Sequence, residues 1–307
     1  MKIFITGASG YIGGAIAEAL IAAGHEVSGL ARSDATARAL SQRGIAPVAG
    51  TLDDSTALAA AALKADATVN AANAGHRAAA EAMVAALAGS GKAFIHTSGS
   101  SIVGTRARGE LVEAVFDEDT PFTPTPQRAA RVAIDAMVRA AAANGVRAAV
   151  IAPSLIYGRG RGLNPHSIQV PWLIALAKKS GVARHIGSGA NRWSNVHIDD
   201  IVSLYTAAIE QAPAGAFYFA ENGENAMREV CEAVSRMLRL GGRTRSMTVE
   251  QAAAEWGEGA ANDTMGSNSR VRARRARAEL GWRPAGKALI EEIERGCYAE
   301  EEGRAAR

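Results

Sequence analysis

Three glycines near the start of the chain, at positions 7, 10 and 13, separate an apolar segment from an apolar helical pattern. In such a loop one glycine permits a tight turn, one lets the backbone approach a pyrophosphate, and the last lets helix and strand pack closely. The N-terminus of the following helix would offer unpaired N–H groups and a partial positive charge to phosphates. The pattern therefore predicts a dinucleotide-binding loop formed by Gly7, Ser9, Gly10, Tyr11, Ile12 and Gly13.

The residues after the second apolar segment bear on which dinucleotide would bind. An NAD site usually has an acidic side chain there, which accepts hydrogen bonds from the ribose hydroxyls. This chain has Arg32 and Ser33 instead, and a guanidinium and a hydroxyl suit a 2′-phosphate. Asp34 lies close by, and a solvated Arg32 is the alternative interpretation. The sequence favours NADP(H) over NAD(H).

The elements that would position this loop alternate between short apolar strands and alanine-rich helices, which predicts a doubly wound parallel α/β sheet of the Rossmann type. The predicted strands are Lys2–Thr6, Glu26–Ala31, Pro47–Ala49, Ala67–Ala71, Lys92–Thr97 and Arg147–Ala152. The predicted helices are Ile12–Ala23, Asp34–Arg43, Ser55–Ala62, Arg77–Gly89 and Ala129–Asn144.

The second half of the chain is richer in loops and predicts a smaller C-terminal α/β lobe that would bind substrate. Its expected elements are helices at Val170–Ala177, Met227–Leu240, within Val271–Leu280 and at Ala288–Cys297, and a strand at Ala216–Ala220. We expect a cofactor domain of residues 1–157 plus about 195–220, and a substrate lobe of about 158–194 plus 221–307.

Composition excludes several classes of protein. The net charge is only +3 and aromatic residues make up 5% of the chain, which argues against a nucleic-acid partner. A basic cluster at 270–277 is interpreted as a solvated helix face. Two cysteines, Cys231 and Cys297, cannot build a disulfide framework, and the six histidines are too dispersed for a metal site. With no signal peptide or membrane span in the sequence, we expect a soluble, cytoplasmic protein without a membrane partner.

The glycine spacing, Gly-x-x-Gly-x-x-Gly, resembles that of the extended branch of the short-chain dehydrogenase/reductase superfamily. Further segments in matching order extend the resemblance over nearly the whole chain: Val69–Asn73, His96–Ser101, Ala152–Gly158, Val196–Asp200 and Leu280–Pro284. The resemblance implies that Thr51 and Leu52 pack the adenine. It also implies a nicotinamide side bordered by Ala71, Ala72, Ser98, Arg131, Pro153 and Ile156.

The expected catalytic residues depart from this family. Its members usually carry a Tyr-x-x-x-Lys pair, in which the tyrosine exchanges the proton while hydride moves. Aligning the helix by Asp135 puts Arg131 at the lysine position and Gln127 at the tyrosine position, and the chain has no tyrosine between Tyr11 and Tyr157. Arginine cannot relay a proton at ordinary pH, and glutamine does not titrate.

Other side chains are therefore candidates for the active site. Ser98 and Ser100 flank the position of the family's serine, although they could equally serve only to satisfy the loop backbone. Tyr157 is a further catalytic candidate. We expect His76, His166 and Trp193 on the substrate side, with an exposed loop position as the alternative for His76.

These observations predict an NADP(H)-dependent oxidoreductase that transfers hydride to or from a C=O, activated C=C or C=N bond of a small molecule. An NADP(H)-binding sensor without turnover is the main alternative. A sugar-nucleotide epimerase or dehydratase ranks lower, because those reactions also begin at the missing tyrosine. The sequence does not decide whether the chain forms a homodimer.

Overall fold

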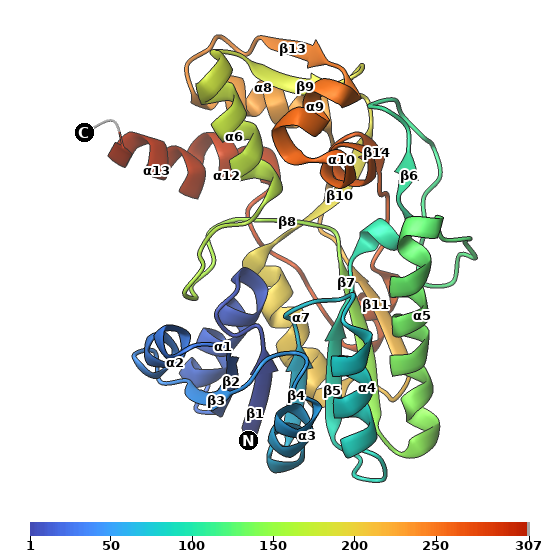
Figure 1. The fold of residues 1–307 in the computed structure, drawn as a ribbon. Coiled ribbons are helices and arrows are strands. Elements are labelled where there is room, and N and C mark those ends of the chain that lie inside the picture. Colours follow the sequence, from blue (N-terminus) through green and yellow to red (C-terminus); the bar gives the residue numbers. More distant parts are fainter. Residues whose placement is uncertain (306–307) are drawn as a thin grey trace.

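The computed structural model describes residues 1–305, and a parallel sheet of seven strands dominates them (Figure 1). The spatial order of the strands is β11-β7-β5-β4-β1-β2-β3, and every neighbouring pair runs parallel. The strands are β1 (Lys2–Thr6), β2 (Glu26–Ala31), β3 (Ala46–Ala49), β4 (Ala67–Asn70), β5 (Ala93–Thr97), β7 (Arg147–Pro153) and β11 (Ala216–Ala220).

Helices cover both faces of this sheet. On one face α3, α4 and α5 pack side by side, while α1 and α7 pack together on the other. The helices of this layer are α1 (Tyr11–Ala22), α2 (Asp34–Ser41), α3 (Ser55–Lys64), α4 (Arg77–Ala86), α5 (Pro126–Ala140), α7 (Ile198–Gln211) and α11 (Arg274–Glu279). Short 3₁₀ turns follow β5 and α5, at Ser100–Val103 and Ala141–Asn144.

The central strands are buried on both faces, as their composition requires. In β7 every residue after Arg147 is buried, and in β1 every residue after Lys2 is buried. Such near-continuous apolar strands suit a parallel sheet enclosed between two helical layers. The predicted doubly wound α/β fold is confirmed.

A second lobe has its own hydrophobic core, which includes Leu173, Trp193 and Val230. Its strands are β8 (Leu155–Tyr157), β9 (Ala183–Ile186), β10 (Arg192–His197), β12 (Glu224–Ala226) and β13 (Thr244–Met247), with β6 (Thr105–Arg106) pairing with β14 (Ser267–Asn268) at its edge. Its helices are α6 (Gln169–Ser180), α8 (Met227–Met237), α9 (Val249–Trp256), α10 (Glu258–Ala260), α12 (Leu289–Arg295) and α13 (Cys297–Ala305), with a π-helical turn at Ala261–Met265.

Two segments pack differently from the expected domain boundaries. Val271, Leu280 and Trp282 join the core of the large sheet, although the sequence assigns residues 221–307 to the smaller lobe. Conversely, Leu155 and Tyr157 belong to the core of the second lobe. The chain therefore crosses to the second lobe immediately after β7 and returns to the first lobe twice, for α7 and β11 and again for residues 271–282, before α12 and α13 pack on the second lobe.

The basic cluster at 270–277 is a set of ion pairs rather than a simply solvated face. Arg270 pairs with Glu224 at 3.0 Å and Arg277 with Glu221 at 2.8 Å. Arg272, Arg274 and Arg275 pair with Glu224, Asp117 and Asp119 respectively. The cluster ties the 113–119 segment to the carboxyl end of β11.

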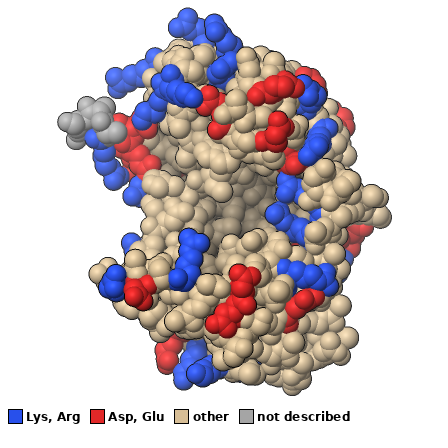
Figure 2. All heavy atoms as spheres, viewed as in Figure 1, with Lys and Arg blue, Asp and Glu red and all other residues tan. Residues whose placement is uncertain are grey.

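The strand order reverses between β1 and β4, and ligands of doubly wound sheets bind beyond the carboxyl ends of the strands at such a point. The molecule is hollowed between the two lobes, and basic side chains lie along the margin of the hollow (Figure 2). Within residues 1–305, no helix is both long enough and apolar enough to cross a membrane.

Candidate active site

The glycine loop between β1 and α1 has the geometry that a pyrophosphate requires. Gly7 has a φ of +78°, and a Cβ there would lie 2.8 Å from the Cα of Ala72. A Cβ on Gly13 would collide with the carbonyl group of Gly7. Gly10 caps α1 without any side-chain hydrogen bond, so no side chain covers the first N–H groups of the helix. The loop thus fits a phosphate group at close range.

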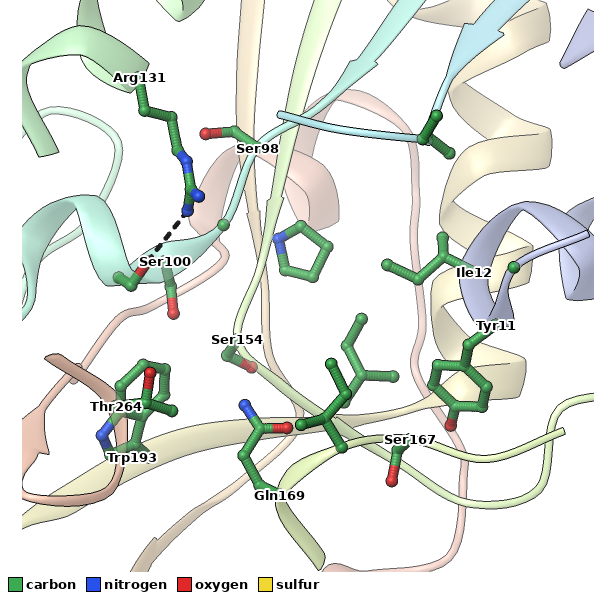
Figure 3. A pocket seen from close by; sticks show the side chains of 18 of the residues that line it. Tyr11, Ile12, Ser98, Ser100, Arg131, Ser154, Ser167, Gln169, Trp193 and Thr264 are labelled. Carbon is green, nitrogen blue, oxygen red and sulfur yellow. Dashed lines mark hydrogen bonds between the residues drawn. The ribbon is translucent and has the colours of Figure 1, made fainter. Parts of the chain in front are cut away.

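One cavity of about 520 Å³ extends from this loop across the carboxyl ends of β4, β5 and β7 to the second lobe. Figure 3 shows Tyr11 and Ile12 on one side of the cavity and Ser98 and Arg131 on the opposite side. The lining residues are Gly10, Tyr11, Ile12, Ala71, Ala72, Ser98, Gly99, Ser100, Ser101, Arg128, Arg131, Pro153, Ser154, Ile156, Asn164, His166, Ser167, Ile168, Gln169, Trp193 and Thr264.

Ser98 lines this cavity and is hydrogen-bonded to a buried acid. Its hydroxyl donates to Oδ2 of Asp135 over 2.6 Å, and both residues are buried. Burial raises the pKa of Asp135 to about 6, although the Ser98 hydrogen bond and the charge of Arg131 act in the opposite direction. The carboxyl group can therefore gain and lose a proton near neutral pH.

A buried polar chain reaches Asp135 from the strand ends. The Thr6 hydroxyl accepts hydrogen bonds from the N–H groups of Ala71 and Ala72, so its own proton goes to Oδ1 of Asn70, at 2.7 Å. The Asn70 amide nitrogen then donates to Nδ1 of His96 over 3.0 Å, which leaves the histidine proton on Nε2.

His96 Nε2 faces Oδ1 of Asp135 at 3.7 Å, and neither atom has a hydrogen-bond partner among the described residues. Burial lowers the pKa of His96 to about 4, with the charge of Arg131 adding to the effect. His96 is therefore neutral at pH 7 and presents an N–H to the carboxyl group.

Arg131 is the residue that we expected at the position of the family's lysine. It lies in the cavity wall, and Nη1 donates to the hydroxyl of Ser101 over 3.3 Å. Burial lowers the pKa of Arg131, and the neighbouring charge of Arg128 lowers it further. Arg131 remains a cation that can donate hydrogen bonds but cannot exchange protons.

Gln127 and Tyr157, two of the predicted catalytic residues, do not line the cavity. Gln127 is exposed in the first turn of α5. Tyr157 is fully buried in β8, and its hydroxyl donates to the carbonyl oxygen of Lys287 over 2.7 Å. Burial also raises the pKa of Tyr157. The geometry supports neither residue as a proton donor to a substrate in this cavity.

The predicted substrate residues are not all brought together. His166 and Trp193 line the cavity, and the indole N–H of Trp193 donates to the carbonyl of Ser267. His76 instead caps α4, accepting from the Ala79 N–H, and contacts Asp53 through Nε2 at 3.0 Å. His76 lies outside the cavity lining, and it is half-buried rather than fully exposed.

The predicted adenosine residues follow the carboxyl ends of β2 and β3, away from the cavity. Arg32 and Ser33 come directly after β2 and are exposed. The Ser33 hydroxyl caps α2 by accepting from the N–H of Thr36. Thr51 and Leu52 follow β3, with Leu52 packed against the core and Thr51 exposed.

Ser100 was predicted and lines the cavity, and its hydroxyl is hydrogen-bonded to that of Ser269 at 2.7 Å.

Several other residues that line the cavity were not predicted. Arg128 could have been found, because residues three apart share a helix face and Arg131 was already a candidate. Ser167, Gln169 and Thr264 come from the second lobe, where no sequence signal connects them to the glycine loop.

Among residues 1–305 there is no group of three or more His, Cys, Asp or Glu side chains that could hold a metal ion. The site consists of the glycine loop, the position where the strand order reverses between β1 and β4, and the polar cavity beyond the strand ends. These features together are typical of a dinucleotide-binding α/β protein.

Comparison with known proteins identifies the family. The model of the NAD dependent epimerase/dehydratase family matches residues 3–218. The chain belongs to this family, and its predicted membership of the extended short-chain dehydrogenase/reductases is confirmed.

Two relatives and two solved structures illustrate the range of this similarity. The chain is 33% identical to the oxidase ucsJ of Acremonium sp over 95% of both proteins. It is 31% identical to the 2-alkyl-3-oxoalkanoate reductase of Stenotrophomonas maltophilia, over 80% of this chain and 77% of that protein. The UDP-glucose 4-epimerase of Thermotoga maritima superposes with a TM-score of 0.78 over 100% of both chains at 15% identity. A dTDP-glucose 4,6-dehydratase of Bacillus anthracis in complex with NAD gives 0.76 over 99% of this chain and 98% of that one, at 17% identity. These two structures share the fold.

Proposed function

We propose that the protein is an NADP(H)-dependent oxidoreductase that reduces a C=O, activated C=C or C=N bond of a small organic molecule, or oxidises the corresponding product. The observation that carries this proposal is the single cavity that joins the glycine loop to Ser98. A dinucleotide anchored at the loop would extend along the strand ends toward Ser98, as in other doubly wound sheets.

The chain's own residues would hold the cofactor at three places. Gly7, Gly10, Gly13 and the N–H groups at the start of α1 would bind the pyrophosphate. The exposed guanidinium of Arg32 would contact a ribose 2′-phosphate, which is why we favour NADP(H). Arg131, Ala71 and Pro153 would border the nicotinamide side. When bound, a reduced nicotinamide supplies a hydride to the substrate carbon.

Ser98 and Asp135 would supply the proton that a carbonyl reduction also needs. As hydride reaches the carbon, the Ser98 hydroxyl gives its proton to the carbonyl oxygen and takes one from the protonated carboxyl of Asp135. The C=O double bond becomes a C–H and an O–H bond, and Asp135 is left as carboxylate, to be reprotonated from solvent after product leaves. When Asp135 is protonated, the 2.6 Å hydrogen bond would run from its O–H to the Ser98 oxygen, which leaves the Ser98 proton free for the substrate. The short distance and the buried position of both groups support this assignment.

His96 would be a positioning residue for this pair. Its N–H faces the second oxygen of Asp135 at 3.7 Å and would favour the carboxylate formed after proton transfer. For an iminium substrate no proton is needed at the carbon that receives hydride, and an activated alkene can take its proton from solvent.

The names of two relatives, an oxidase and a 3-oxoalkanoate reductase, support oxidoreduction over simple cofactor binding. An NADP(H) sensor without turnover is the alternative, favoured by the absence of a tyrosine between Tyr11 and Tyr157. A sugar-nucleotide epimerase or dehydratase is supported by the name of the family and by solved structures that share the fold at 15% and 17% identity, but it ranks lower because those reactions begin at the tyrosine that this chain lacks.

The test is NADPH consumption by the purified protein with a panel of ketones, aldehydes, enones and imines. We expect loss of NADPH absorbance with at least one substrate class, and faster loss with NADPH than with NADH. Tight NADPH binding with no consumption across the panel would contradict the proposal and favour the sensor.

A further inference from the structure

Two arginines project from one face of α5 into the cavity. Arg128 and Arg131 are three residues apart, and both line the cavity. No aspartate or glutamate is among the described residues that line it, and the remaining polar groups are hydroxyls, amides and one imidazole. The cavity thus has a net positive charge on its α5 side.

Neither guanidinium forms an ion pair with a carboxylate among residues 1–305, although the charge of Asp135 partly offsets that of Arg131. Nη2 of Arg128 donates to the backbone carbonyl of Asp263 over 3.2 Å, and Arg131 contacts the Ser101 hydroxyl. By contrast, Arg270 and Arg277, which do not line this cavity, are each paired with a glutamate. Two neighbouring cations in a partly enclosed site repel each other, and an anion between or beside them relieves that cost.

The two arginines are held by different parts of the fold. Arg131 contacts Ser101, which follows β5, and so stands beside Ser98 and the expected nicotinamide. Arg128 is held by Asp263 of the second lobe, next to Thr264, on the side of the cavity away from the glycine loop. A guanidinium has five N–H donors, and the contact with Asp263 leaves the other N–H groups of Arg128 available to a ligand.

We propose that Arg128 binds an oxyanion, a carboxylate or a phosphate, carried by the substrate at a point remote from the bond that is reduced. This inference rests on the proposed function and deepens it, because it names the chemical class of the substrate. The planar guanidinium matches both oxyanions through paired hydrogen bonds, whereas a neutral substrate would leave the charge uncompensated.

The experiment measures ligand binding by calorimetry in the presence of NADP⁺, so that it does not depend on turnover. The probes are two matched pairs: 4-oxopentanoate with 4-oxopentanamide, and dihydroxyacetone phosphate with dihydroxyacetone. We expect the anion of one pair to bind about 10- to 100-fold more tightly than its neutral partner. The pair that shows this preference distinguishes a carboxylate from a phosphate.

Arg128→Gln should abolish the preference, and Arg128→Lys should restore part of it, because lysine keeps the charge but lacks the paired donors. Arg77→Gln is the matched control, since Arg77 is exposed on α4 and paired with Glu81. The wild-type preference should persist in this control.

Three results would overturn the inference. The first is equal binding of the anion and its neutral partner to the wild type in both pairs. The second is an unchanged preference for the anion in Arg128→Gln, and the third is that Arg128→Gln lowers the affinity for NADP⁺ rather than the preference for the anion. A protein that binds the anions through Arg128 but never consumes NADPH would contradict only the proposed function.

Discussion

At the scale of single residues, the proposed mechanism gives the role of the family's tyrosine to the hydroxyl of Ser98, which is hydrogen-bonded to the buried carboxyl of Asp135. Serine alone is too weak an acid to donate a proton near neutral pH. In the proposed mechanism the Asp135 carboxyl, whose pKa is raised, would provide the proton and restore the hydroxyl. Ser100 has no such partner, because its hydroxyl is bonded to Ser269.

The two serines should therefore behave differently when replaced. Ser98→Ala should lower kcat for carbonyl reduction by about 10²- to 10⁴-fold, the usual contribution of a positioned general acid. Ser100→Ala should cost clearly less. Steady-state kinetics with a substrate found in the panel checks both, with Ser90→Ala, whose hydroxyl bonds to Leu87 outside the cavity, as a control. Equal losses for the two cavity serines would contradict the role of Ser98.

Charge at the end of β2 should determine cofactor choice. Arg32→Glu should weaken NADPH binding by about 10- to 100-fold, because a charge-assisted contact to the 2′-phosphate becomes a repulsion, while NADH binding should change little. Fluorescence titration with both nucleotides measures the effect, with Arg245→Glu, exposed on β13, as the matched control. An unchanged NADPH affinity in Arg32→Glu would contradict the assignment.

Some of these residues could be predicted from sequence and others could not. Ser98 and Arg131 follow from the end of a strand and the register of a helix. The partner of Ser98 does not, because only the packing of α5 on the sheet brings Asp135 to its hydroxyl. Gln127 was predicted to face the site, but α5 begins at Pro126, and its first turn leaves that side chain exposed while Arg128 lines the cavity.

At the scale of elements, the contact between the glycine loop and α1 governs the cofactor site. Gly13→Ala would place a methyl group against the carbonyl of Gly7, and overpacking of this kind costs about 1–3 kcal/mol. We expect lower stability and NADPH affinity reduced about tenfold or more, since α1 must move away from the loop. Thermal unfolding and nucleotide titration measure both quantities.

The control for this substitution is Gly259→Ala, where a Cβ would meet no atom within 4 Å. That variant should keep its affinity. If Gly13→Ala also binds NADPH normally, the loop does not hold the pyrophosphate as described.

The elements of the first half were predictable because short apolar runs alternate with longer alanine-rich segments, in the order that a parallel sheet covered by helices requires. In the second half the short strands β8, β9, β10, β12 and β13 were missed. They are three to six residues long and gain their stability from pairing between distant segments, as β9 does with β13, which local periodicity does not reveal.

At the scale of the whole molecule, the cavity lies between two separate hydrophobic cores, and its lining residues come from both lobes. A ligand bound there contacts both lobes at once and should stabilise the folded chain as a unit. At 100 times its Kd a ligand contributes about 2.7 kcal/mol, so NADP⁺ should raise Tm by about 5 °C. NAD⁺ at the same concentration should raise it less, and equal shifts measured by calorimetry would contradict the cofactor preference.

The central claim is that hydride transfer in this cavity is coupled to a proton from Asp135. It is tested most directly by single-turnover reduction of a carbonyl substrate with NADPH deuterated at the transferred position, followed across pH in the wild type and in Asp135→Asn. The pKa of Asp135 is raised to about 6, so the carboxyl is protonated below that pH and loses its proton above it. We predict deuterium in the product, a wild-type rate that falls as pH rises through about 6, and a slow rate without that pH dependence in Asp135→Asn. A product without deuterium, or a variant whose rate and pH profile match the wild type, would contradict the account.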